Sequence, residues 1–365
     1  MKRIYIYLCV LGGLLGMNLI SPVFLMAQNK KQEAVLKVYN WEDYFDKDAI
    51  KGFEEKTGIK VDLSTFDNEE EMFSEVQSHL EDHDVIIVSS DILSQMIEMR
   101  LLSELDLWDI SNFKNINHRF INPKYDPGNK HSVPYMWGIT GLVVNRSFIK
   151  ENVDSWRSLW DVKYKGRTAL LSDIDEVMSI GLLSEGYSFN STDPMQLDAA
   201  AEKLLSQTNL ISGYFDIKTV IKKVDDGKVW LAQAYNGDVM FAMQENKNLE
   251  FVVPKEGAPF WVDNFVISRD SKNKKQAIMF INYMLDPQVS AKNANYLWYA
   301  NCNMAAAAFT NKEIINSSVL YPSEVTLQKC SLFFPQGGEE KRAQRVKIIN
   351  KLWSQLQLRI GHQDK

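Results

Sequence analysis

Cysteine and histidine are scarce: the 365 residues include three cysteines and five histidines. Cys9 lies in an apolar N-terminal segment, which leaves Cys302 and Cys330 as the only pair that could form a disulfide bridge. The sequence alone does not decide whether this bridge forms. No Cys-x-x-Cys pair occurs. His79 and His83 have helical spacing, but two acidic residues between them are typical of a solvated helix end. We therefore expect no metal site and no cofactor.

Sequence motifs of catalysis are also missing. The chain has no Gly-rich phosphate loop and no Gly-x-Ser-x-Gly elbow. The best case for an enzyme is a glycosidase pair formed by Asp173 and Glu176. Such pairs come from different elements, about 5 to 9.5 Å apart, whereas these two would share one helical turn. We therefore expect a protein that is not an enzyme.

Positive charge is not in excess, since 41 Lys and Arg stand against 47 Asp and Glu, a formal net charge of −6. Residues 1–27 hold two of the cations and no acidic residue, so the remainder carries −8. This balance argues against nucleic-acid binding. It suits a cationic ligand, although many exported proteins are acidic merely to stay soluble.

The apolar stretch at the start of the chain is typical of a targeting segment. Lys2 and Arg3 precede an apolar run over residues 4–20, and Leu25-Met26-Ala27 follows it. We predict a signal peptide over residues 1–27 and export to the periplasm. The alternative is a membrane anchor, but three glycines interrupt the run. The residues after Cys9 are large, so lipid anchoring is not supported. The remaining 338 residues suffice for two lobes.

The hydrophobic pattern after this segment predicts a βαβαβ unit. Strands are expected at 35–40, 59–63 and 84–88, with helices at 46–56 and 69–80. Crossover helices cover both faces of a parallel sheet, so this is an open α/β lobe with its crevice at the carboxyl ends of the strands. A second α/β lobe and two strands that cross between the lobes are expected from later segments: 141–145, 168–171, 229–234 and 251–253, with crossings at 139–145 and 261–268.

Polar and aromatic residues follow these strands. In the segment Trp41 to Tyr44, Asp43 is either part of a binding loop or the cap of the next helix. Ser89 follows the third strand. Asp173 and Glu176 would share the first turn of a helix, where carboxylates also suit the helix dipole without any ligand.

Further candidates lie in the second half of the chain. Tyr235 to Asp238 follows an apolar strand. Trp261 and Asp263 would share one face of a strand, because side chains alternate with period two. Trp298-Tyr299 adds aromatic surface, for which simple packing is the alternative. Carboxylates beside aromatic rings would suit an organic cation, because rings cover methylene groups and attract ammonium groups.

Several motifs together resemble one family, the spermidine/putrescine-binding proteins of bacterial ABC importers. The motifs are Val38 to Trp41, Phe53 to Lys60, Val133 to Gly138, Thr192 to Pro194, Pro254 to Gly257 and Phe260 to Asp263. The resemblance implies an α/β, two-lobed type II periplasmic-binding-protein fold with a ligand cleft between the lobes. Lobe 1 would comprise 32–139 plus 262–307, and lobe 2 would comprise 140–261 plus 308–365. It implies a monomer that captures polyamines and delivers them to permease subunits in the inner membrane.

The resemblance also implies which residues contact the ligand: Trp41, Asp43, Tyr44, Ser89, Asp173, Glu176, Tyr235, Asp238, Trp261, Asp263 and Tyr299. Departures from the family pattern stand at three positions, Glu42, Asp91 and Tyr235. The carboxylates at 42 and 91 would either favour a longer polyamine or face solvent. A family contact near the C-terminus has only Gln336 as a candidate here.

The chain contains motifs of both the putrescine-preferring and the spermidine-preferring branches of the family. The sequence therefore does not decide the length of the polyamine that binds. Two alternatives to polyamine import also remain. One is a binding protein for another organic cation, a basic amino acid or a quaternary amine. The other is a polyamine sensor without a permease.

Overall fold

The computed structural model describes residues 35–334 and 339–360. The expected signal peptide, residues 1–27, and Gln336 lie outside this part of the chain. Among the described helices, none has both the length and the apolar character that crossing a membrane requires.

The described strands are β1 (Val35–Trp41), β2 (Lys60–Phe66), β3 (Val85–Ser89), β4 (Ser132–Asn145), β5 (Thr168–Leu171), β6 (Gly213–Phe215), β7 (Leu231–Tyr235), β8 (Leu249–Val252), β9 (Ala258–Ile267), β10 (Ala300–Asn301) and β11 (Cys330–Leu332). The α-helices are α1 (Lys47–Thr57), α2 (Glu69–Ser78), α3 (Ser90–Glu98), α4 (Ile174–Glu185), α5 (Pro194–Gln207), α6 (Ile217–Asp225), α7 (Asn236–Ala242), α8 (Lys274–Met284), α9 (Pro287–Leu297), α10 (Lys312–Ile315), α11 (Glu324–Leu327) and α12 (Glu339–Ile360). Short 3-10 helices are η1 (Leu80–Asp82), η2 (Leu107–Asp109), η3 (Ser111–Asn115), η4 (His118–Phe120), η5 (Trp156–Trp160), η6 (Val162–Tyr164) and η7 (Met304–Ala308).

Local sequence explains the first helix well. Asp46 caps α1 by accepting a hydrogen bond from the Asp48 backbone N at 2.7 Å. Gly58 ends the helix with a positive φ of 69°, a conformation that glycine adopts without strain. Ala49 and Phe53, four residues apart, turn one face of the helix into the core.

The strands form one path in the order β2-β1-β3-β9-β4-β7-β5-β6. In the first region of the sheet, β1 pairs in parallel with β2 and with β3. In the second region, β5 pairs in parallel with β6 and with β7. Each parallel set places the carboxyl ends of its strands along one edge.

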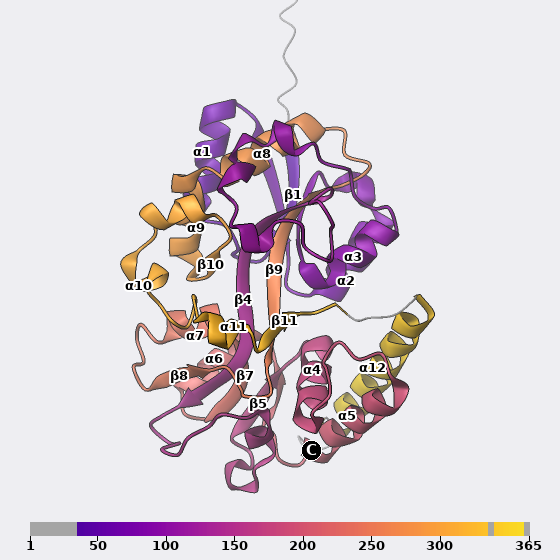
Figure 1. Cartoon of the computed structure of the whole chain (residues 1–365), viewed down its shortest axis with the longest axis vertical. Coiled ribbons are helices and arrows are strands. Elements are labelled where there is room, and N and C mark those ends of the chain that lie inside the picture. The colour runs from indigo at the N-terminus through magenta and orange to yellow at the C-terminus, as the bar shows by residue number, and fades with distance from the viewer. Residues whose placement is uncertain (1–34, 335–338, 361–365) are drawn as a thin grey trace, which may run out of the picture. The chain divides into compact units, whose positions relative to one another are not determined.

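Two long strands join the regions, β4 and β9, which lie side by side in the middle of Figure 1. β4 pairs with β9 from Ser132 to Ile139 and with β7 and β8 from Thr140 to Asn145. Its 14 residues are all buried. The sequence predicted a crossing strand only over 139–145, whereas β4 begins at Ser132 and continues through a bulge after Pro134.

Helices cover both faces of each region (Figure 1). In the first region, α1 and α8 bury residues in one core cluster, while α2 and α3 bury Met72 and Met96 in another on the opposite face. In the second region, α6 lies on one face, and α4 with α5 lies on the other, where α12 packs against α5. The expected βαβαβ unit and the second α/β unit are both present.

Candidate functional site

Six carboxylates from both regions converge at the carboxyl ends of the strands. Four of them were predicted, Asp173, Glu176, Asp238 and Asp263. The other two are Glu69 and Asp91. Burial, followed by the charges of Asp173 and Asp263, raises the pKa of Glu69 to about 8. None of the six forms an ion pair with a cation among residues 35–334 and 339–360, although the charge of Lys218 lowers the pKa of Asp238.

Asp263 is the most deeply buried of the six, with 6% of its surface exposed. It lies on β9, and its Oδ2 accepts a hydrogen bond from the Tyr44 hydroxyl at 2.5 Å. Burial raises the pKa of Asp263 to about 7, whereas the Tyr44 hydrogen bond lowers it. A bound ammonium group would neutralise this carboxylate.

Glu176 and Asp173 lie at the start of α4. Asp173 caps the helix by accepting a hydrogen bond from the Glu176 backbone N at 3.0 Å. The Glu176 carboxylate accepts hydrogen bonds from Thr140 Oγ1 at 2.7 Å and Gln233 Nε2 at 3.2 Å. Burial raises the pKa of Glu176 to about 8 and that of Asp173 to about 6. Asp173 nevertheless keeps an exposed surface.

Aromatic rings connect the carboxylates. Trp261 makes edge contacts with Tyr235 and Tyr299, at centroid distances of 5.9 and 5.3 Å. Tyr299 in turn lies 6.3 Å from the ring of Tyr44, and its hydroxyl donates a hydrogen bond to Asp238. Burial raises the pKa of Asp238 to about 6. The rings therefore form a continuous aromatic wall beside Asp238 and Asp263.

Two glycines make room for this wall. A Cβ on Gly138 would lie 2.2 Å from Trp261 Cζ2 and 2.7 Å from Asn236 Oδ1. A Cβ on Gly237 would lie 2.4 Å from the Tyr299 ring. Both separations are far below van der Waals contact, so the ring positions depend on the absence of these side chains.

We expect Gly138→Ala to lower the free energy of unfolding by about 1 to 3 kcal/mol, because the added methyl group overlaps the Trp261 ring. Chemical denaturation would measure this loss. The double variant Gly138→Ala/Trp261→Phe removes the overlapping ring atoms and should be less destabilised than the sum of the two single variants. Additive effects would contradict this account of Gly138.

Asp43 lies in the loop after β1 and does not cap the next helix. The cap of α1 is Asp46, so Asp43 is not the cap that the alternative required. Asp43 has a φ of 56° and an exposed side chain, and both Asp43 and Glu42 pair with Lys218 of α6, at 3.4 and 2.6 Å. Glu42 therefore lies in an exposed ion pair that connects the two regions.

Trp41 and Ser89 border the cluster. Trp41 packs against Phe66 with ring centroids 4.5 Å apart, and its Nε1 is buried without a hydrogen-bond partner among the described residues. Ser89 caps α3 by accepting a hydrogen bond from the Asp91 backbone N at 3.2 Å. The nearby Ser89 also lowers the pKa of Glu69.

Glu69 was missed by the sequence reasoning. It is the first residue of α2 and follows the carboxyl end of β2 by three residues. The rule that drew attention to the ends of the first and third strands applies equally to β2. Three acidic residues, Glu69 to Glu71, stand in the first turn of α2, where carboxylates also suit the helix dipole without any ligand.

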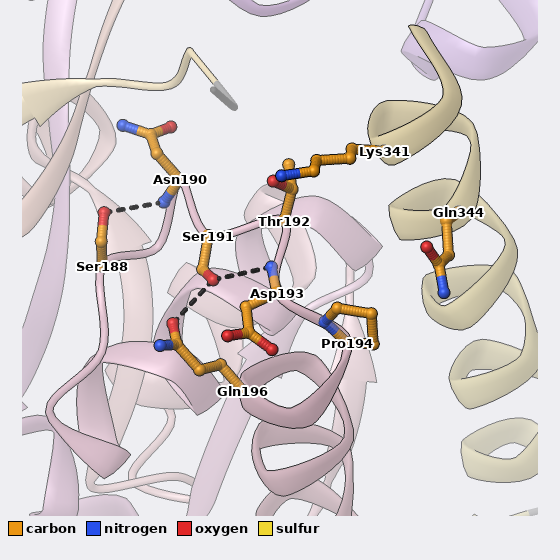
Figure 2. A pocket seen from close by; sticks show the side chains of 9 residues that line it. All are labelled: Ser188, Asn190, Ser191, Thr192, Asp193, Pro194, Gln196, Lys341 and Gln344. Atoms are coloured by element: carbon orange, nitrogen blue, oxygen red, sulfur yellow. Dashed lines mark hydrogen bonds between the residues drawn. The ribbon is translucent and has the colours of Figure 1, made fainter. Parts of the chain in front are cut away.

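A polar pocket of about 530 Å³ lies elsewhere, at the start of α5 beside α12 (Figure 2). None of the predicted site residues lines it. Ser191 Oγ donates to Gln196 Oε1 at 2.7 Å and accepts from the Asp193 backbone N at 3.1 Å, so local hydrogen bonds satisfy this hydroxyl. Lys341 and Asp193 place opposite charges on its walls (Figure 2). The carboxylate cluster is the better candidate for a binding site.

The two cysteines that could have formed a bridge are both free. Cys302 is buried, and Cys330 on β11 is partly buried.

Comparison with known proteins identifies the family of the chain. The family model for bacterial extracellular solute-binding proteins matches residues 48–320. The spermidine/putrescine-binding periplasmic protein of Salmonella typhimurium is 32% identical over 332 residues, which cover 90% of this chain and 93% of that protein. The putrescine-binding periplasmic protein SpuD of Pseudomonas aeruginosa is 30% identical over 350 residues, with coverage of 90% and 95%.

Solved structures agree. A Listeria monocytogenes protein, whose name assigns it to a spermidine/putrescine ABC transporter, matches with a TM-score of 0.82 and 34% identity over 87% of this chain and 98% of that one. The substrate-binding protein PotD of Streptococcus pneumoniae matches with a TM-score of 0.77 and 32% identity over 90% and 99%. These matches confirm the predicted α/β, two-lobed fold. Because the family model covers about three quarters of the sequence, the chain belongs to the bacterial extracellular solute-binding proteins.

Proposed function

We propose that this protein captures polyamines between its two lobes and delivers them to an ABC-type permease. One observation carries the proposal: six carboxylates converge around an aromatic wall without a protein cation among the described residues to neutralise them. Buried carboxylates without partners are costly, and ammonium groups of a ligand would supply the missing charge.

The arrangement suits a linear polyamine. Such a ligand places ammonium groups along a flexible methylene chain, so it needs separated carboxylates with apolar surface between them. Asp263 with Tyr44, and Asp173 with Glu176, would hold ammonium groups. Trp261, Tyr235 and Tyr299 would cover the methylene groups and add about 0.5 to 2 kcal/mol for each favourable cation–π contact.

Ligand capture would involve both regions. Residues 32–139 plus 262–307 would form one lobe, and residues 140–261 plus 308–365 the other. Asp263 and Tyr44 would belong to the first lobe, and the α4 carboxylates to the second lobe. A ligand that contacts both sets at once would draw the lobes together, with β4 and β9 as the hinge. No reaction on the ligand is part of this function.

The expected setting follows from the family. Relatives are named as periplasmic binding proteins and as components of ABC transporters. We propose that the chain is exported, acts in the periplasm as a monomer, and meets permease subunits at the inner membrane. The signal peptide proposed for residues 1–27 would direct this export.

Calorimetric titration of the purified protein with putrescine, spermidine, spermine, lysine and choline would test the proposal. We expect heat of binding for at least one polyamine and weaker binding of lysine. The carboxylate of lysine needs a cationic partner. The six carboxylates would repel it, and no cation forms an ion pair with them in the described part of the site. An absence of binding to all three polyamines would disprove the proposal.

A further inference from the structure

Glu69 and Asp91 enlarge the acidic cluster on the side of the first region. Glu69 starts α2, and Asp91 lies in the first turn of α3. Asp173 and Glu176 of α4 act on this side from the second region, because their charges, together with that of Glu69, raise the pKa of Asp91. Four carboxylates from three helices therefore share one end of the site.

One oxygen in this cluster has no partner. Glu69 Oε1 is buried and makes no hydrogen bond with any described residue. The neighbouring Asp175 differs, because it pairs with Arg345 of α12 at 3.4 Å. A buried carboxylate oxygen that receives neither a proton donor nor a cation from the protein indicates a ligand group at this position.

We propose that Glu69 and Asp91 form an additional ammonium subsite with Asp173 and Glu176, and that this subsite favours polyamines with three or more ammonium groups over diamines. The inference rests on the proposed polyamine binding. A diamine offers two charges, which Asp263 and the α4 carboxylates would already accept. Four carboxylates at one end match a terminal ammonium and a second ammonium a few methylene groups away.

The other extra carboxylate of this chain does not contribute. Glu42 is exposed and paired with Lys218, so its charge is already compensated. Glu69 and Asp91 have no such cation. Glu69 and Asp91 would therefore set a preference for ligands with more positive charges. This preference is separate from the general ability of the site to bind amines.

Glu69→Gln and Asp91→Asn would test the subsite in calorimetric titrations with putrescine, spermidine and spermine. We expect each variant to lose tenfold or more in affinity for spermidine and spermine, and less than threefold for putrescine, because each removes a charge partner from a desolvated ammonium group. Glu71→Gln is the matched control, since Glu71 is exposed in the same turn of α2.

Equal losses for all three ligands, or no loss for any, would overturn the subsite. The wild-type protein separates this result from a failure of the proposed function: if it binds no polyamine, the function itself is wrong. Thermal unfolding should show that both variants fold, because removing a buried negative charge does not leave a cation unpaired.

Discussion

Asp263→Asn is expected to weaken polyamine binding by more than tenfold. The carboxylate is buried on β9 beside the aromatic wall, so a bound ammonium group would be desolvated there and depend on this one charge. Asparagine keeps the size of the side chain and removes the charge. Calorimetric titration of the wild-type protein and the variant with the same polyamine would measure the change.

Two further variants define what the measurement means. Tyr44→Phe removes the hydroxyl that donates to Asp263 but keeps the carboxylate, and it should cost less affinity than Asp263→Asn. Asp62→Asn alters an exposed aspartate on β2 and should leave affinity unchanged. Unchanged affinity of Asp263→Asn would exclude Asp263 from the site.

Polyamine affinity is expected to rise about tenfold or more between pH 6 and pH 8, because binding of an ammonium group releases a proton from at least one carboxyl group of the site. Burial raises the pKa of Glu69 and Glu176 to about 8 and that of Asp263 to about 7, so Glu69 and Glu176 are mostly protonated and Asp263 is partly protonated in the ligand-free protein at neutral pH. An ammonium ligand favours their ionised forms and displaces those protons, whereas primary ammonium groups stay charged over this range.

Proton release can be measured by titrating in two buffers of different ionisation enthalpy. The stability of the ligand-free protein provides a second check with a defined sign. A carboxyl group whose folded pKa is raised stabilises the fold fully below its unfolded pKa near 4, and this contribution is lost as pH rises through the folded pKa. The melting temperature should therefore fall from pH 6 to pH 8 without ligand. Affinity independent of pH would contradict the assignment of these carboxylates.

Much of the fold could be predicted from local sequence. The apolar run that forms β3 is long enough for a buried strand, and Thr57-Gly58 correctly marked the end of α1. The strand-end rule then led to Asp173, Glu176, Asp238 and Tyr44, because ligand crevices of open α/β sheets lie at those ends. The structure brings these residues into one network, and their contacts with ligand remain a prediction.

The pairings across the molecule could not be predicted. Lys218 is one of many exposed lysines in the sequence, and nothing near it indicates that it meets Glu42, 176 residues earlier. Likewise, the full length of β4 depends on partners at both of its ends. Such contacts depend on how distant segments pack, and local periodicity carries no information about them.

The strand β4 also affects how the protein unfolds. Its first half is hydrogen-bonded in one region of the sheet and its second half in the other, without a break in the strand. Loss of either region would leave half of β4 without its partners and expose buried backbone groups. The two regions of the sheet therefore share stability and should unfold as one cooperative unit.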